Sequence, residues 1–170
     1  MEIQILDWLQ GMHTPLLDRV MCTVTSLGNA GMIWIVVAVV LLIIPKTRRV
    51  GIAVMAALIL DVILCNGILK HLVARVRPCD VNTTVQLLIP RPDDYSFPSG
   101  HTAASFAATA ALFFAGKNKF WIPALVLSVL IAFSRLYLYV HYPTDVLGGM
   151  LVGVFCGWVS VQCVKQMFNK

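Results

Sequence analysis

The stretch KFWIPALVLSVLIAFSRLYLYVHYPTD, residues 119–145, is an apolar run that ends in a polar string. A helix that crosses a membrane needs roughly 20 predominantly apolar residues, and 119–138 meets that length. The rest of the chain has the same character, since 59% of its 170 residues are hydrophobic and only 12% are charged. A soluble domain carries about twice that charged fraction. The composition therefore favours a membrane protein whose apolar surface faces lipid.

Four more apolar segments have the length of membrane-spanning helices, which gives about five in all. These segments are residues 27–44, 50–72, 100–116 and 144–164. Gly28 and Gly31 interrupt the start of the first one. Residues 1–26 predict short amphipathic helices that lie on the membrane surface. The expected fold is all-α, an integral membrane helix bundle forming a single domain over 1–170, with a transmembrane core at 27–165.

The connections between these segments differ in charge. Basic residues without any Asp or Glu follow the first and fifth segments and join the third to the fourth. They are Lys46, Arg48, Arg49, Lys117, Lys119, Lys165 and Lys170. Because basic loops stay in the cytoplasm, the N-terminus, the 73–98 loop and the 138–143 turn are expected on the extracytoplasmic side of the cell membrane.

Three polar strings fall on that extracytoplasmic side: KHLVARVRP at 70–78, PSGH at 98–101 and SRLYLYVHYPTD at 134–145. Lys70 and Arg77 are seven residues apart, so a continuing helix would place both on one face. Basic residues at a helix end often snorkel to the membrane interface. Here they occur, together with Arg75, on the side that a basic excess should avoid, which favours the binding of an anion.

The second and third strings carry groups that suit phosphate chemistry. The string PSGH opens an apolar helix, and a helix N-terminus binds phosphate through its free backbone N–H groups. A serine cap beside an incidental histidine is the alternative. Arg135 offers a planar group that pairs with phosphate through two hydrogen bonds. Asp145 lies four residues after His141 and could hold one imidazole nitrogen, leaving the other free to attack, or both could simply cap the last helix.

Two other polar features have less defined roles. Asp61 falls in the middle of the second apolar segment, where an ionisable group usually faces the bundle interior. We interpret it as structural, either protonated or paired with a polar group such as Asn66. The loop 79–97 is polar, and its Asp93 and Asp94 are expected to be solvated.

Together the three strings resemble the signature of the type 2 phosphatidic acid phosphatase family of integral membrane enzymes, in a short bacterial form. That signature is Lys, six residues, Arg-Pro; then Pro-Ser-Gly-His; then Ser-Arg, five residues, His, three residues, Asp. Every element occurs here with its spacing: Lys70, Arg77, Pro78, Pro98, Ser99, Gly100, His101, Ser134, Arg135, His141 and Asp145. The resemblance extends over about residues 26–165. Many family members have six spans, and this chain is expected to lack the first.

The resemblance also implies a role for each residue of the signature. His141 would attack phosphorus, Asp145 would orient it, and His101 would protonate the leaving oxygen and later activate water. The groups implied in phosphate binding are Lys70, Arg77, Ser99, Gly100 and Arg135. No metal ion or other cofactor is implied.

The expected function is hydrolysis of a lipid phosphomonoester or diphosphate through a phosphohistidine intermediate. Substrates of the family in bacteria include phosphatidate, phosphatidylglycerophosphate and undecaprenyl diphosphate. The alternatives are a lipid phosphotransferase that uses the same intermediate and a non-catalytic binder of anionic lipids. The expected partners are the lipid substrate and membrane lipids, and a homo-oligomer is left open. Nucleic acid is not expected, because no basic stripe with interleaved aromatic residues occurs.

Overall fold

The computed structural model describes residues 1–116 and 119–168, and every regular element in these ranges is a helix. The N-terminal elements are α1 (Glu2–Gln10), α2 (Pro15–Leu27), the 3₁₀-helix η1 (Asn29–Gly31) and α3 (Met32–Ile43). The chain continues with α4 (Arg48–Asp61), the π-helix η2 (Val62–Leu69), α5 (Lys70–Val73) and α6 (Pro78–Val81). A long loop then leads to α7 (Gly100–Phe114), α8 (Trp121–Tyr137) and α9 (Pro143–Phe168). The all-α prediction is confirmed.

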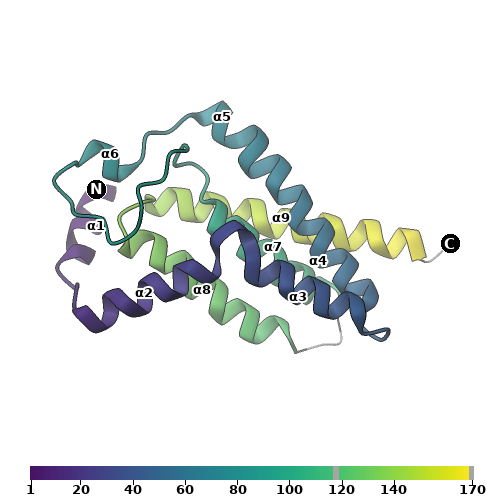
Figure 1. The fold of residues 1–170 in the computed structure, drawn as a ribbon. Coiled ribbons are helices and arrows are strands. Elements are labelled where there is room, and N and C mark those ends of the chain that lie inside the picture. Colours follow the sequence, from purple (N-terminus) through teal and green to yellow (C-terminus); the bar gives the residue numbers. More distant parts are fainter. Residues whose placement is uncertain (117–118, 169–170) are drawn as a thin grey trace.

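Helix α7 is the central element of the bundle (Figure 1). It contacts α4, α8 and α9, and most of its residues are buried. Its sequence GHTAASFAATAALFF is rich in alanine, so neighbouring helices can approach its backbone closely. The arrangement puts the N-terminus of α7, which carries the PSGH string, inside the protein rather than at its surface.

Small residues also bring α9 against α7. Gly149, Gly153 and Gly157 recur every four residues along α9, and a Cβ atom at any of them would collide with α7. Small residues at this spacing are typical of helix contacts in membranes. The close contact aligns the N-termini of the two helices, so that Ser99 N donates a hydrogen bond to Asp145 O at 3.0 Å. The packing thereby fixes the second polar string relative to the third.

A single methyl group at this contact is expected to destabilise the protein. A Cβ atom at Gly157 would lie 2.6 Å from Ala110 Cβ and 2.7 Å from Ala107 O, so the helices would have to move apart. We expect Gly157→Ala to lower the free energy of unfolding by about 1–3 kcal/mol, the usual range for overpacking. The matched control is Gly67→Ala, where the nearest atom is 3.7 Å away. Thermal unfolding in detergent micelles checks the pair, and equal stability of both variants would contradict the close contact.

Two helical segments of the described chain are long and apolar enough to cross a membrane, Arg48–Val81 and Pro143–Phe168. The pair Pro15–Leu27 and Asn29–Ile43 meets the same criterion together, although a bend of 47° separates the two helices, and it adds a third span if it crosses as one unit. Helices α7 and α8 are shorter, with 15 and 17 residues. The structure therefore supports a helical membrane bundle, whereas the count of five spans stays a prediction.

The bend between α2 and α3 comes from two left-handed residues at the interruption of the apolar run, an alanine and a glycine. Ala30 and Gly31 have φ angles of 50° and 66°, in the left-handed region that favours glycine. The segment expected to span from residue 27 therefore starts with a tight turn, and the regular helix begins only at Met32. This turn directs Asn29 toward the polar strings, as described below.

The segment 1–26 forms the two predicted helices, but the first is less free to contact lipid than expected. Helix α2 begins at a Thr14 cap, whose Oγ1 accepts from Leu17 N. On α1, Trp8 remains exposed. Leu6 and Leu9, in contrast, are buried in a cluster with the residues that follow α8. Half of the apolar face of α1 thus packs on the protein.

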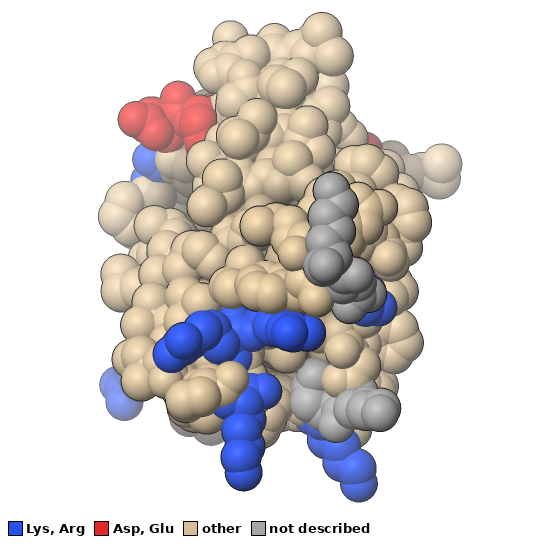
Figure 2. Space-filling view, turned by 90° about the vertical axis from the view of Figure 1, so that its right-hand side faces the viewer, with Lys and Arg blue, Asp and Glu red and all other residues tan. Residues whose placement is uncertain are grey.

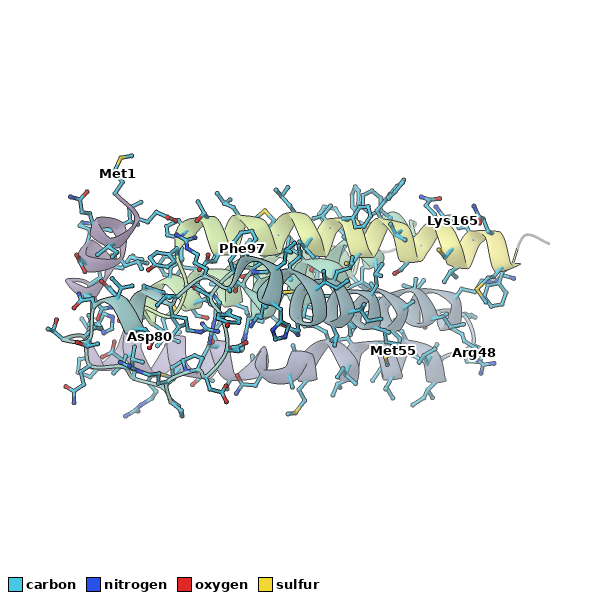
Figure 3. All side chains as sticks on the ribbon, turned by 90° about the horizontal axis from the view of Figure 1, so that it is seen from above. Met1, Arg48, Met55, Asp80, Phe97 and Lys165 are labelled. Carbon is cyan, nitrogen blue, oxygen red and sulfur yellow. The ribbon has the colours of Figure 1, made fainter. Side chains whose placement is uncertain are left out.

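Basic side chains gather at one end of the bundle. Figure 2 looks at this end and shows a group of Lys and Arg side chains on it. Figure 3 places Arg48 and Lys165 together there, with Met1 and Asp80 at the opposite end. The predicted loop residues Lys117 and Lys170 lie outside the described part of the chain. The charge asymmetry expected from the sequence is therefore present along the long axis of the bundle.

Candidate active site

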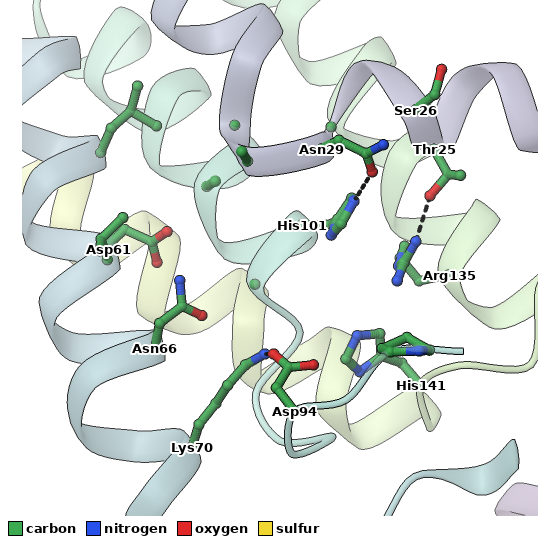
Figure 4. A pocket seen from close by; sticks show the side chains of 18 of the residues that line it. Thr25, Ser26, Asn29, Asp61, Asn66, Lys70, Asp94, His101, Arg135 and His141 are labelled. Atoms are coloured by element: carbon green, nitrogen blue, oxygen red, sulfur yellow. Dashed lines mark hydrogen bonds and ion pairs between the residues drawn. The ribbon is translucent and has the colours of Figure 1, made fainter. Parts of the chain in front are cut away.

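Residues from all three polar strings line one cavity of about 990 Å³ (Figure 4). The predicted site residues on its wall are Lys70, Arg77, Gly100, His101, Arg135 and His141. The other two lie behind the wall. Ser99 is fully buried and its Oγ accepts a hydrogen bond from Thr102 Oγ1 at 3.0 Å. Asp145 is fully buried beside His141.

Lys70 and Arg77 meet by a different route from the one predicted. The helix does not continue through both residues, because it ends at Val73 and Ala74 adopts a left-handed φ of 47°. Arg77 then has extended backbone angles before Pro78 starts α6. The turn at Ala74 brings the two cations to the same carboxylate, that of Asp94. The expectation of one continuous helical face was therefore wrong, although the juxtaposition it predicted occurs.

A buried arginine fixes the ring of His141. Arg77 Nη1 donates to Val140 O at 2.7 Å and lies 3.2 Å from His141 Nε2. Since a guanidinium only donates, Nε2 must be the acceptor, and the proton of the neutral ring is on Nδ1. Burial, with the charges of Arg77 and Arg135, lowers the pKa of His141 to about 3. The imidazole is thus neutral at physiological pH and presents a nitrogen lone pair to the cavity wall.

Asp145 is held by three hydrogen bonds on the far side of that ring. Its carboxylate accepts from Arg75 Nη1 at 2.7 Å, from Ser96 Oγ and from Tyr142 N at 2.9 Å. The distance between Asp145 Oδ2 and His141 Nδ1 is 3.5 Å. A carboxylate fixed in this way can orient the imidazole and favour a proton on Nδ1.

The structure assigns Arg75 a position that the sequence did not predict. It was counted among the cations available for an anion, but it does not line the cavity. Its guanidinium bonds Asp145, Thr144 and Glu2, each at 2.7 Å. Glu2 Oε1 in turn accepts from Thr144. The first residues of the chain are therefore connected to the carboxylate behind His141.

The turn between α2 and α3 supplies the opposite wall of the cavity. Arg135 Nη1 donates to Thr25 Oγ1 at 2.7 Å, and His101 Nε2 lies 3.0 Å from Asn29 Oδ1. Gly28 packs on the His101 ring, since a Cβ atom there would lie 2.8 Å from His101 Cδ2. The sequence showed the glycine break but gave no sign that Thr25 and Asn29 would contact the site.

The loop residue Asp94 is exposed, as expected, but it also binds the two cations. One carboxylate oxygen accepts from Lys70 Nζ and the other from Arg77 Nη2. Partial burial would raise the pKa of Asp94, but the hydrogen bonds and charges of Lys70 and Arg77 outweigh it and lower the pKa to about 2. Its neighbour Asp93 is exposed, as predicted.

Away from these cations the cavity becomes an apolar groove between α3 and the α4–η2 helix. The apolar residues that line this part are Ile35, Met55, Leu58, Ile59, Val62 and Ile63. Asp61 also lines it and is 1% exposed. Within residues 1–116 and 119–168 its Oδ1 has no hydrogen-bond partner.

Comparisons with known proteins identify the family of the chain. The model of the PAP2 superfamily matches residues 50–168. An undecaprenyl-diphosphatase of Sulfolobus acidocaldarius is 35% identical over 76% of this chain and 63% of its own length, so the chain spans less than two thirds of that relative. The undecaprenyl-diphosphatase BcrC of Bacillus subtilis is 30% identical over 94% of this chain and 82% of the relative.

Two solved structures share the fold. The crystal structure of Aquifex aeolicus LpxE superposes with a TM-score of 0.82 at 28% identity, covering 95% of this chain and 94% of that one. A transmembrane phosphatidylglycerolphosphate phosphatase of the PAP2 type from Bacillus subtilis gives a TM-score of 0.78 at 28% identity, covering 98% and 85%. The signature residues lie at one cavity, and the family model matches 119 residues, 50 to 168. The chain therefore belongs to the PAP2 superfamily.

Proposed function

We propose that this protein is a membrane lipid phosphate phosphatase that works through a phosphohistidine intermediate. The observation that carries the proposal is the composition of the cavity. One end gathers Lys70, Arg77 and Arg135 around two imidazoles, and the other end is an apolar groove. Such a cavity suits a ligand with a phosphate at one end and hydrocarbon at the other. A water-soluble phosphate ester has no hydrocarbon chain that could fill the groove.

In the proposed first step, Arg77 Nη1 turns from His141 Nε2 to an oxygen of the phosphate, which frees the Nε2 lone pair. Nε2 then attacks phosphorus and the bond from phosphorus to the leaving oxygen breaks. The ring proton on Nδ1 stays against Asp145, and His101 gives a proton to the leaving oxygen. In the second step His101 takes a proton from water as the water attacks phosphorus, the nitrogen–phosphorus bond breaks and phosphate is released. The lipid alcohol, or the lipid monophosphate when the substrate is a diphosphate, is the other product.

The cations are proposed to stabilise the charge on the transferring group, since phosphoryl transfer spreads negative charge over three equatorial oxygens. Arg77 is already beside His141 Nε2. Arg135 has its Nε free of hydrogen bonds to the described residues while Nη1 is fixed by Thr25. Gly100 N, at the start of α7, adds a backbone donor, and Ser99 contributes by shaping that helix terminus.

The substrates proposed are phosphatidate, phosphatidylglycerophosphate and undecaprenyl diphosphate. Relatives named undecaprenyl-diphosphatase and phosphatidylglycerophosphatase B support the last two. We also propose a multi-pass protein with the site on the extracytoplasmic side of the cell membrane. The position of the cavity at the end opposite Arg48 and Lys165 supports this orientation. The segment 1–26 is proposed as part of the same domain as the core, because Thr25 and Glu2 contact site residues.

A phosphate-release panel tests the proposal. Purified protein in detergent is incubated with each of the three lipids, and free phosphate is measured without any acceptor lipid. Release from at least one lipid is expected. Phosphate transfer that occurs only when a second lipid alcohol is added would instead establish the phosphotransferase. Binding of all three lipids without any phosphorus–oxygen cleavage would establish a non-catalytic binder.

A further inference from the structure

The carboxylate of Asp94 binds Lys70 and Arg77, two of the cations that the proposed function assigns to the substrate phosphate. Its two oxygens are divided between Lys70 Nζ and Arg77 Nη2, as two oxygens of a phosphate would be. Arg77 Nε also donates to Asp94 O at 2.7 Å, so the main chain of the loop is attached to the same guanidinium. The side chains of Lys70 and Arg77 are 9% and 3% exposed, whereas that of Asp94 is 48% exposed. Asp94 thus covers two buried cations from the open side of the cavity.

An anion can reach both cations only by displacing this carboxylate. The incoming anion and the Asp94 carboxylate compete for the same two cations. The pKa of Asp94 is lowered to about 2, so the carboxylate stays ionised over the whole physiological pH range. A phosphodiester carries about one negative charge, as each phosphate of a nucleic acid backbone does. Replacing one monoanion by another gains little Coulomb energy. A phosphomonoester carries about −1.5 to −2 at pH 7 and has three terminal oxygens, so it gains more from the same cations.

We propose that Asp94 is a specificity-determining residue that excludes phosphodiester lipids from the cavity and yields only to phosphate groups of higher charge. The proposal rests on the proposed function, because it concerns how the phosphatase chooses among membrane lipids. A site with three cations at the membrane surface faces phosphodiester headgroups at high local concentration. Without an internal competitor these headgroups would fill the site without being cleaved. Asp94 removes that inhibition while leaving phosphomonoesters and diphosphates able to bind.

The loop position of Asp94 suits this role. The residue lies beyond the end of α6 and before the Ser96 that bonds Asp145, in a segment without regular structure. Displacement of its side chain therefore breaks no helix. The direct neighbour Asp93 has the same charge and is exposed on the same loop, but it makes no ion pair with the described residues. Replacement of Asp93 is therefore a matched control, because it removes the same charge from the loop without removing an ion pair.

The test compares wild type, Asp94→Asn and Asp93→Asn, each purified in detergent. Two quantities are measured: the inhibition constant of orthovanadate, and the inhibition of phosphate release from phosphatidate by phosphatidylglycerol, a phosphodiester lipid, in mixed micelles. In wild type only the fraction of sites not occupied by the Asp94 carboxylate can bind vanadate, which lowers the apparent affinity. We therefore expect Asp94→Asn to bind vanadate about tenfold or more tightly. Phosphatidylglycerol should become a competitive inhibitor of this variant only. Wild type and Asp93→Asn should remain insensitive to it.

Equal sensitivity of wild type and Asp94→Asn to phosphatidylglycerol would overturn the inference. So would a loss of turnover in Asp94→Asn with unchanged vanadate affinity, because Asp94 would then act in the chemical step. The proposed function can fail separately, if wild type releases no phosphate from any lipid. In that case calorimetric titration of the two proteins with inorganic phosphate still tests the competition by Asp94.

Discussion

Replacement of His141 by alanine is expected to abolish phosphate release, with kcat reduced about 10⁴-fold or more, as for removal of other covalent nucleophiles. The reason is geometric. Among the described residues that line the cavity, His141 alone has one ring nitrogen, Nε2, beside a donor, Arg77, and the other facing a carboxylate. Burial and the two arginines lower the pKa of His141 to about 3, so the attacking form is fully present at neutral pH. Alanine leaves the cations in place but no nucleophile.

The measurement is phosphate release together with trapping of radiolabelled phosphate on the protein after denaturation in detergent at alkaline pH, because acid hydrolyses the nitrogen–phosphorus bond of phosphohistidine. Wild type should retain label and His141→Ala should not. His71→Ala is the matched control, because His71 is exposed and does not line the cavity. Substantial turnover by His141→Ala would remove the covalent step, and label on the variant would place the phosphoryl group elsewhere. Vanadate binding by His141→Ala would show that the phosphate site is still folded.

The sequence predicted the helices of the bundle and the groups of the site because both depend on local signals. Apolar runs of helical length marked α4, α7, α8 and α9 within a few residues. The spacing of Lys70 and Arg77, and that of His141 and Asp145, predicted each pair separately, and the family signature implied that the two pairs meet. The helix that was expected to continue from Lys70 to Arg77 does not, since the left-handed turn at Ala74 has no strong local signal in an alanine.

The residues that sequence reasoning missed are fixed by contacts between distant segments. Asp94 is separated from Lys70 by 24 positions and meets it only because the loop folds back over the cavity. Arg75 is 70 positions from Asp145, and Glu2 is 73 positions from Arg75. No periodicity or motif encodes such pairs, because they arise from the way α1, the 73–98 loop and α9 pack together. These contacts must be known before one can say whether a charged residue near a motif binds the substrate or a catalytic side chain.

The network around Asp145 leads to the second large effect. Asp145→Asn is expected to lower kcat by about 10⁴-fold, the loss found when the aspartate that orients a catalytic histidine becomes asparagine. The carboxylate only accepts hydrogen bonds, and its position next to Nδ1 favours the proton there and the lone pair on Nε2. An asparagine amide can donate to Nδ1, which favours the proton on Nε2 and removes the lone pair that attacks. The amide nitrogen would then replace Oδ2, the acceptor of both Ser96 Oγ and Tyr142 N, while Arg75 keeps its acceptor at Oδ1.

This prediction separates the orientation of His141 from the binding of the substrate. Because Lys70, Arg77 and Arg135 are unchanged, the affinity for vanadate and the KM should change much less than kcat. Asp80→Asn is the matched control, since Asp80 pairs with Arg91 at 3.1 Å on the loop side of the protein and does not line the cavity. If Asp145→Asn retained kcat, His141 would not depend on Asp145 for its tautomer, and Arg77 alone would have to fix the ring. A parallel rise in KM and fall in kcat would instead show that Asp145 holds the fold of the cavity through Arg75 and the N-terminal helix.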